Sequence, residues 1–75
     1  MPQLPVLRAR ELIAALREAG FDVVRQKGSH VRLQHPDGRV VTVPMHASQD
    51  IGRGLLRKIL RDADLTVDEL LRLLH

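Results

Sequence analysis

The chain has 75 residues, which is enough for one small domain and too few for two, so we expect residues 1–75 to form a single domain. Its 12 Lys and Arg side chains outnumber 9 Asp and Glu, and most of the basic ones are arginines, which favours a polyanionic partner. The lack of cysteine excludes a disulfide framework. No signal-peptide pattern is present, and no apolar run reaches the roughly 18 residues of a membrane span, so we expect a cytoplasmic protein without membrane contact.

The first predicted element is a helix over about residues 8–19. Leu12, Ile13 and Leu16 recur on one helical face, with charged side chains opposite. Gly20 follows where a left-handed C-terminal cap belongs.

Three strands are predicted next, over residues 21–26, 30–35 and 39–44. The first is rich in β-branched residues, and the second alternates polar and apolar side chains. A glycine-bearing turn "KGSH" joins the first two strands, and "PDG" separates the second from the third. This pattern predicts an antiparallel meander.

Two helices are predicted to close the chain. Residues 51–63 repeat apolar side chains with the helical period, and Thr66 with Glu69 has capping-box spacing at the start of a third helix. The element order is α-β-β-β-α-α. The predicted class is α+β, with a three-stranded antiparallel sheet that carries its helices on one face and leaves the other face to solvent.

The strand alternation places a candidate reactive residue on the open face. If Val31 and Leu33 are buried, then His30 and Arg32 lie together on the other side of the sheet. A single histidine at a strand end is more often a structural polar residue than a catalytic one. From the pattern alone, both interpretations stay open.

The other histidines give weaker signals. His35 precedes the "PDG" turn and is expected to stabilise it from the helix side or the rim of the sheet. His46 lies in the loop before the second helix, where either a structural contact or an approach to the open face is consistent with its position. The histidine spacings match no metal motif, so no metal ligand and no cofactor is expected.

Basic residues line one side of the second predicted helix. Arg53, Arg57 and Arg61 are four residues apart, and Lys58 lies beside them. A phosphate-binding face and an ordinary solvated face fit this pattern equally well. The only aromatic residue, Phe21, belongs to the core pattern, which argues against a protein that stacks bases on its sheet.

Two segments of the chain resemble a known protein family. The segments "GFDVVRQKGSHVRLQHPDGRVVTVPMH" and "IGRGLLRKILRDADLTVDELL" resemble the HicA family of bacterial toxins, also called YcfA-like proteins. The shared features are the "GSH" turn, "VPMH" after the third strand and the "GLLRKIL" helix. The chain departs from the family at Leu55, where threonine is common, and at Arg8, where Ser or Thr often caps the first helix.

The resemblance implies a fold like a double-stranded RNA-binding domain. It also implies the toxin of a type II toxin–antitoxin system: a ribosome-independent mRNA interferase that cleaves RNA, arrests growth, and is masked by a cognate HicB-like antitoxin. The family's catalytic histidine falls on His30.

RNA cleavage without a metal suits these residues. The 2′-hydroxyl attacks the adjacent phosphorus, which needs a base for its proton and an acid for the leaving oxygen. We expect His30 to transfer protons and Lys27 and Arg32 to neutralise the phosphate, with possible support from Ser29 and His46. RNA contacts are further expected along the second helix, at Arg57, Lys58 and Arg61.

Two alternatives from other classes stay open. A non-catalytic module of the same fold would bind double-stranded RNA without cutting it, which suits a chain with no second obvious acid or base. An interaction protein would use the same basic face for an acidic protein partner alone.

Overall fold

The computed structural model describes residues 3–46 and 50–74 of the chain. The element order is the predicted one, and the sheet has the order β1-β2-β3 with both pairs antiparallel. Within the described residues, no helix is long and apolar enough to cross a membrane. The elements are α1 (Ala9–Glu18), β1 (Asp22–Lys27), β2 (His30–Gln34), β3 (Val40–Pro44), α2 (Arg53–Ala63) and α3 (Val67–Leu73).

The first helix begins and ends within one residue of the prediction. Arg8 is its N-cap residue, and because an arginine side chain has no acceptor, the cap is made in the reverse direction: the Glu11 carboxylate accepts the Arg8 backbone N–H at 3.0 Å. At the other end Gly20 has φ +104°, and the Phe21 N–H bonds to the Leu16 carbonyl at 3.0 Å. This is the glycine-terminated helix end that the sequence predicts.

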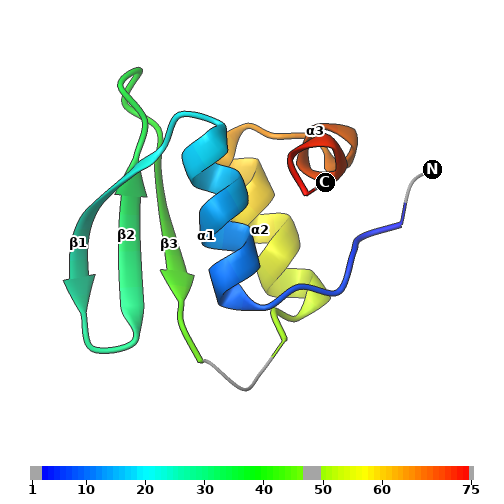
Figure 1. Cartoon of the computed structure of the whole chain (residues 1–75), viewed down its shortest axis with the longest axis horizontal. Helices are drawn as coiled ribbons and strands as arrows, with labels where there is room; N and C mark the ends of the chain where they lie inside the picture. Colours follow the sequence, from blue (N-terminus) through cyan, green and yellow to red (C-terminus); the bar gives the residue numbers. More distant parts are fainter. Residues whose placement is uncertain (1–2, 47–49, 75) are drawn as a thin grey trace.

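The helices cover one face of β2 and β3, whereas every residue of β1 is exposed. Figure 1 shows the three strands side by side, with α1 and α2 next to β3 and β1 farthest from the helices. The alternation in β2 and β3 is clean: Val31, Leu33, Val41 and Val43 are buried, and the residues between them are not. The open face of the sheet predicted from the sequence is thereby confirmed.

The core combines this sheet face with one stripe of each helix. In α1 the stripe is Leu12 and Leu16, while α3 contributes Leu70; each of these side chains is fully buried. The core also takes in Phe21, which follows α1 and is fully buried as predicted. From α2 come the buried residues Leu56, Ile59, Leu60 and Ala63.

The second helix starts two residues later than predicted. Ile51 is buried, but Gly52 has an extended backbone at φ −66° and ψ 154° and serves as the N-cap. The apolar pattern therefore runs past the hydrogen-bonded helix, because Ile51 reaches the core from an extended segment whose N–H bonds to the Leu7 carbonyl at 2.7 Å. Asp64 ends α2 in the left-handed conformation, with φ 55°.

The turn between β2 and β3 is tied to the helix layer. Arg39 donates Nη1–H to the Ala63 carbonyl at the end of α2, and its guanidinium lies over the Phe21 ring at 5.2 Å from the centroid. Its Nε pairs with the Asp37 carboxylate at 2.8 Å, and this side-chain hydrogen bond lowers the pKa of Asp37 below its ordinary value. Arg39 thus joins three parts of the chain.

His35 has the structural position expected from its sequence context. Its Nδ1 accepts the Asp37 backbone N–H at 3.1 Å, and its ring meets Phe21 edge to face at 5.2 Å between centroids. The side chain is half-buried on the helix side of the turn. His35 therefore stabilises the turn and lies on the opposite side of the sheet from His30.

Candidate nucleic-acid interface

A tight hairpin turn places His30 at the start of β2. Lys27 and His30 are the last register partners of β1 and β2, so the turn contains only Gly28 and Ser29. Gly28 has φ +58° and Ser29 has no positive φ, and a positive φ at the first central residue alone is the mark of a type II′ turn, which matches the twist of antiparallel strands. Glycine at this position lets the sheet end directly at His30.

Charge on the open face concentrates around His30. The imidazole is exposed; Lys27 lies opposite it on β1 and Pro44 opposite it on β3, while Arg32 follows on the same face of β2. Within residues 3–46 and 50–74, the side chains of His30, Lys27 and Arg32 form no hydrogen bond or ion pair. All three of these side chains are accessible to a ligand.

The two residues considered as support lie near the same turn. Ser29 is half-buried within it, and its carbonyl accepts the Met45 backbone N–H. This hydrogen bond holds the segment after β3 beside the hairpin turn. The exposed His46 is the next residue in the sequence. Because His46 is next in sequence to Met45, it remains a candidate for the second proton-transfer group.

The structure adds one basic residue that sequence reasoning missed. Arg25 on β1 is the register partner of Arg32 on β2, and it is exposed. Counting back by two from Lys27 would have placed Arg25 on the same face, but the run of β-branched residues before it gave no alternation to count. The open face therefore carries Arg25 as well as Lys27 and Arg32.

The basic residues of α2 form a separate group. Arg57, Lys58 and Arg61 are all exposed, as expected for the polar side of this helix. They belong to the helix layer, whereas His30 lies on the face of the sheet turned away from the helices. Lys58 is moreover paired with Asp62 at 2.7 Å, one helical turn on. The structure does not bring these residues together with His30.

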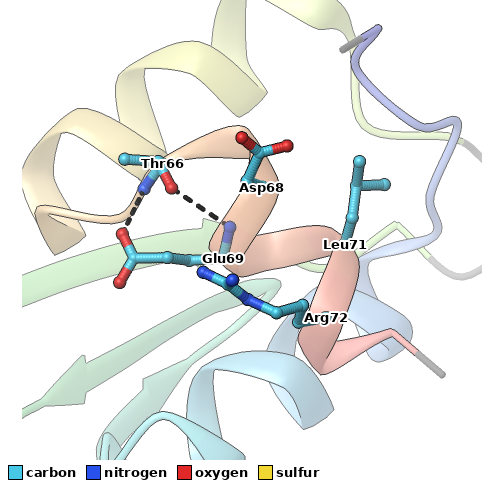
Figure 2. A pocket seen from close by; sticks show the side chains of 5 residues that line it. All are labelled: Thr66, Asp68, Glu69, Leu71 and Arg72. Atoms are coloured by element: carbon cyan, nitrogen blue, oxygen red, sulfur yellow. Dashed lines mark hydrogen bonds between the residues drawn. The ribbon is translucent and has the colours of Figure 1, made fainter.

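A pocket beside α3 is lined by the residues that cap this helix and by their neighbours. Figure 2 shows the Thr66 hydroxyl accepting the Glu69 backbone N–H at 3.1 Å, while the Glu69 carboxylate accepts the Thr66 backbone N–H at 2.9 Å. The capping box predicted from the sequence is confirmed, and these bonds lower the pKa of Glu69. Asp68, Leu71 and Arg72 complete the lining. The polar groups that bond here serve the helix end, and His30 is not among the lining residues.

Potential metal ligands are dispersed. Across residues 3–46 and 50–74, no three His, Asp or Glu side chains gather closely enough to hold a metal ion. On the open face the reactive groups are one imidazole and several fixed cations, a combination suited to binding a phosphodiester and moving a proton beside it.

Comparison with known proteins assigns the family. The model of the HicA toxin of bacterial toxin–antitoxin systems matches residues 9–65, about three quarters of the chain, from the first residue of α1 to just beyond α2. No curated protein matches the chain. The matched segment contains the whole sheet, the hairpin turn with His30 and the basic helix. The chain therefore belongs to the HicA family of bacterial toxin–antitoxin toxins.

Proposed function

We propose that this chain is a metal-independent mRNA interferase, an endoribonuclease that uses His30 for proton transfer. The observation that carries the proposal is the arrangement at the hairpin: an exposed imidazole with Lys27 opposite it and Arg32 on the same face, and no protein partner for any of the three within the described residues. Membership of a toxin family supports a growth-arresting activity.

The reaction is an in-line transesterification. The 2′-hydroxyl oxygen of one nucleotide bonds to the adjacent phosphorus as the bond from phosphorus to the 5′-oxygen breaks. A base accepts the 2′-hydroxyl proton and an acid protonates the departing 5′-oxygen, so the products are a 2′,3′-cyclic phosphate and a 5′-hydroxyl. A histidine side chain ordinarily titrates near pH 6.5 and can serve in either role.

Each neighbour of the imidazole has a defined part. Lys27 lies directly across from His30 and neutralises charge that builds on the scissile phosphate, and Arg32 adds a second cation on the same face. His46, in the segment that follows β3, supplies the second proton transfer if His30 performs only one. Ser29 holds the turn and hence the start of β2.

The basic side of α2 serves binding at a distance from the reaction. Arg57, Lys58 and Arg61 hold the RNA backbone by charge, in the helix layer rather than at the sheet face. The RNA must then pass around an edge of the domain to meet both surfaces. A cognate HicB-like antitoxin, the partner that family membership implies, suppresses the activity by covering either surface.

One observation favours a second candidate, a module that binds double-stranded RNA without cutting it. The cross-strand neighbours of His30 are Lys27 and Pro44, so the register gives the imidazole no carboxylate or second histidine as a direct partner. A binding module needs the cations and not the imidazole.

Incubation of the purified chain with RNA in EDTA distinguishes these functions. Cleavage is expected for the wild type, and RNA binding without cleavage would favour the second candidate. His30→Ala should abolish cleavage and growth arrest while the protein stays folded, because exposed substitutions usually change stability by no more than about 0.5 kcal/mol. Gln34→Ala, on the same strand and face but at its far end, is the matched control and should cleave normally.

The chemistry has its own test. RNA with a single 2′-deoxy sugar at the scissile position should resist cleavage, and the product of ordinary RNA should carry a 2′,3′-cyclic phosphate. Cutting of the deoxy substrate would show that water is the nucleophile and would rule out the in-line mechanism. Persistent toxicity of a well-expressed His30→Ala variant would remove His30 from the reaction.

A further inference from the structure

The register set at the hairpin turn determines which side chains share the face of His30. From the outer end of the hairpin, Asp22 pairs with Gln34 and Val23 with Leu33. Between Val23 and Arg25 the register shifts by one residue, as at a β-bulge. The pairs nearer the turn are Arg25 with Arg32, Gln26 with Val31, and Lys27 with His30.

The two-residue turn places Arg25 on the open face. From Lys27 opposite His30, the register continues without a break to Arg25 opposite Arg32, so Arg25 and Lys27 lie on the same face of β1. The shift between Val23 and Arg25 begins only beyond this pair. Bulges are over-represented beside functional sites.

The resulting arginine pair is unfavourable for the fold. Like charges directly opposite each other across two antiparallel strands destabilise the sheet. Neither Arg25 nor Arg32 has an ion pair or hydrogen bond within the described residues, and the acid on this strand, Asp22, pairs in register with Gln34 beyond them. Thr42, the partner of Arg32 on β3, is neutral. The sheet contains no compensation for this charge, whereas an anionic ligand would supply it.

We infer that Arg25 and Arg32 together form a binding site for one phosphate of the RNA chain, next to the phosphate that reacts at His30. Two guanidinium groups offer forked donors that match phosphate oxygens. Along β2, His30 and Arg32 are two residues apart, roughly 6.6 Å at the strand rise, a spacing comparable to that of successive phosphates. The inference rests on the proposed function, since it names the group that positions the same substrate.

The site makes Arg25 a positioning residue. Arg25 is not the cross-strand neighbour of His30, because Lys27 occupies that position on β1. By fixing the neighbouring phosphate, the pair sets which phosphodiester lies over the imidazole. Loss of Arg25 should therefore raise KM more than it lowers kcat.

The test measures RNA affinity across salt concentrations for Arg25→Gln, Arg32→Gln and the double variant, each in the full-length chain. Each single variant should bind on the order of tenfold more weakly, since a charged hydrogen-bonding contact is lost. The log–log salt slope should fall by about 0.7 in the double variant, because one phosphate of single-stranded RNA is no longer neutralised, and by part of that in each single variant. The double variant should lose less binding free energy than the sum of the losses in the two single variants, because both side chains hold one phosphate. Arg17→Gln, an exposed arginine of α1, is the control.

A stability measurement separates ligand binding from a structural role. Relief of the charge repulsion should leave the urea midpoint of Arg25→Gln equal to or above that of the wild type. A lower midpoint with an unaltered salt slope would overturn the inference, and so would RNA binding equal to that of Arg17→Gln. Unchanged RNA affinity with weakened binding to poly-glutamate would assign the pair to an acidic protein partner instead, and would also overturn it.

The outcome is independent of the chemistry at His30. Affinity is measured with His30→Ala present as a second change, so that RNA is not consumed if His30 is catalytic. If RNA binding depends on the arginine pair while His30→Ala still cleaves RNA, the phosphate site stands and the proposed proton transfer fails. If His30→Ala abolishes cleavage while the arginine variants bind RNA normally, the proposed proton transfer stands and the phosphate site fails.

Discussion

Substitution of Gly20 by alanine should destabilise the domain more than the same change at Gly38, a glycine with nearly the same φ. Gly20 has φ +104° and Gly38 has φ +101°, a region that costs an alanine about 1–2 kcal/mol at either site. They differ in surroundings. A Cβ at Gly20 would lie 2.8 Å from Nε2 and 3.0 Å from Cδ2 of His35, whereas one at Gly38 would have nothing within 4 Å.

The magnitude follows from how firmly His35 is held. Its Nδ1 accepts the Asp37 N–H and its ring packs on Phe21, so the imidazole gives up both contacts if it moves aside. Overpacking of this kind costs about 1–3 kcal/mol. We therefore expect Gly20→Ala to lower the free energy of unfolding by roughly 2–5 kcal/mol and Gly38→Ala to lower it by roughly 1–2 kcal/mol. A domain of this length has a total free energy of unfolding of roughly 4–11 kcal/mol, so the loss expected for Gly20→Ala is severe.

The assay is urea unfolding followed by far-ultraviolet circular dichroism, with a double-mutant cycle between Gly20→Ala and His35→Ala. Because His35→Ala opens the space that the new methyl group needs, the double variant should recover about 1–3 kcal/mol relative to the sum of the two single changes. Equal destabilisation by Gly20→Ala and Gly38→Ala, or additive effects in the cycle, would refute the close approach of His35 to the helix end.

Three further predictions concern charge and helix ends. Replacing Arg57, Lys58 and Arg61 by Gln should weaken binding of all RNA sequences about equally and reduce the log–log salt slope by about 0.7–0.9 per lost contact; an unaltered slope would show a merely solvated helix face. Asp64→Gly should stabilise the protein by up to about 1 kcal/mol in urea unfolding, because glycine adopts the left-handed end of α2 without strain, and a loss of stability would contradict this. The pKa of Glu69 is lowered in the folded state, so its stabilising effect is present above the ordinary value of 4.5 and is lost as the pH falls below it; Glu69→Gln should therefore show a smaller loss of stability than the wild type between pH 7 and pH 3.

Local patterns were sufficient to predict the elements and the position of His30. The helical period of α1, the spacing of Thr66 and Glu69, and the glycine in the hairpin turn each act within a few residues. In β2 the alternation alone predicts that Val31 is buried and His30 exposed, since successive side chains of a strand point to opposite faces. These interactions are short-range, so a single chain segment contains all the information they need.

Pairing between strands and packing between layers determined the rest. That Arg25 stands opposite Arg32 is a property of the pairing between β1 and β2, and no pattern within β1 specifies this partner. Likewise, only the packed helices show that Arg57 and Arg61 lie apart from His30, because the sequence gives the polar side of α2 but not the layer it occupies. Arg39 spans from Asp37 to the Ala63 carbonyl for the same reason: contacts between distant segments depend on how the chain is brought together in space.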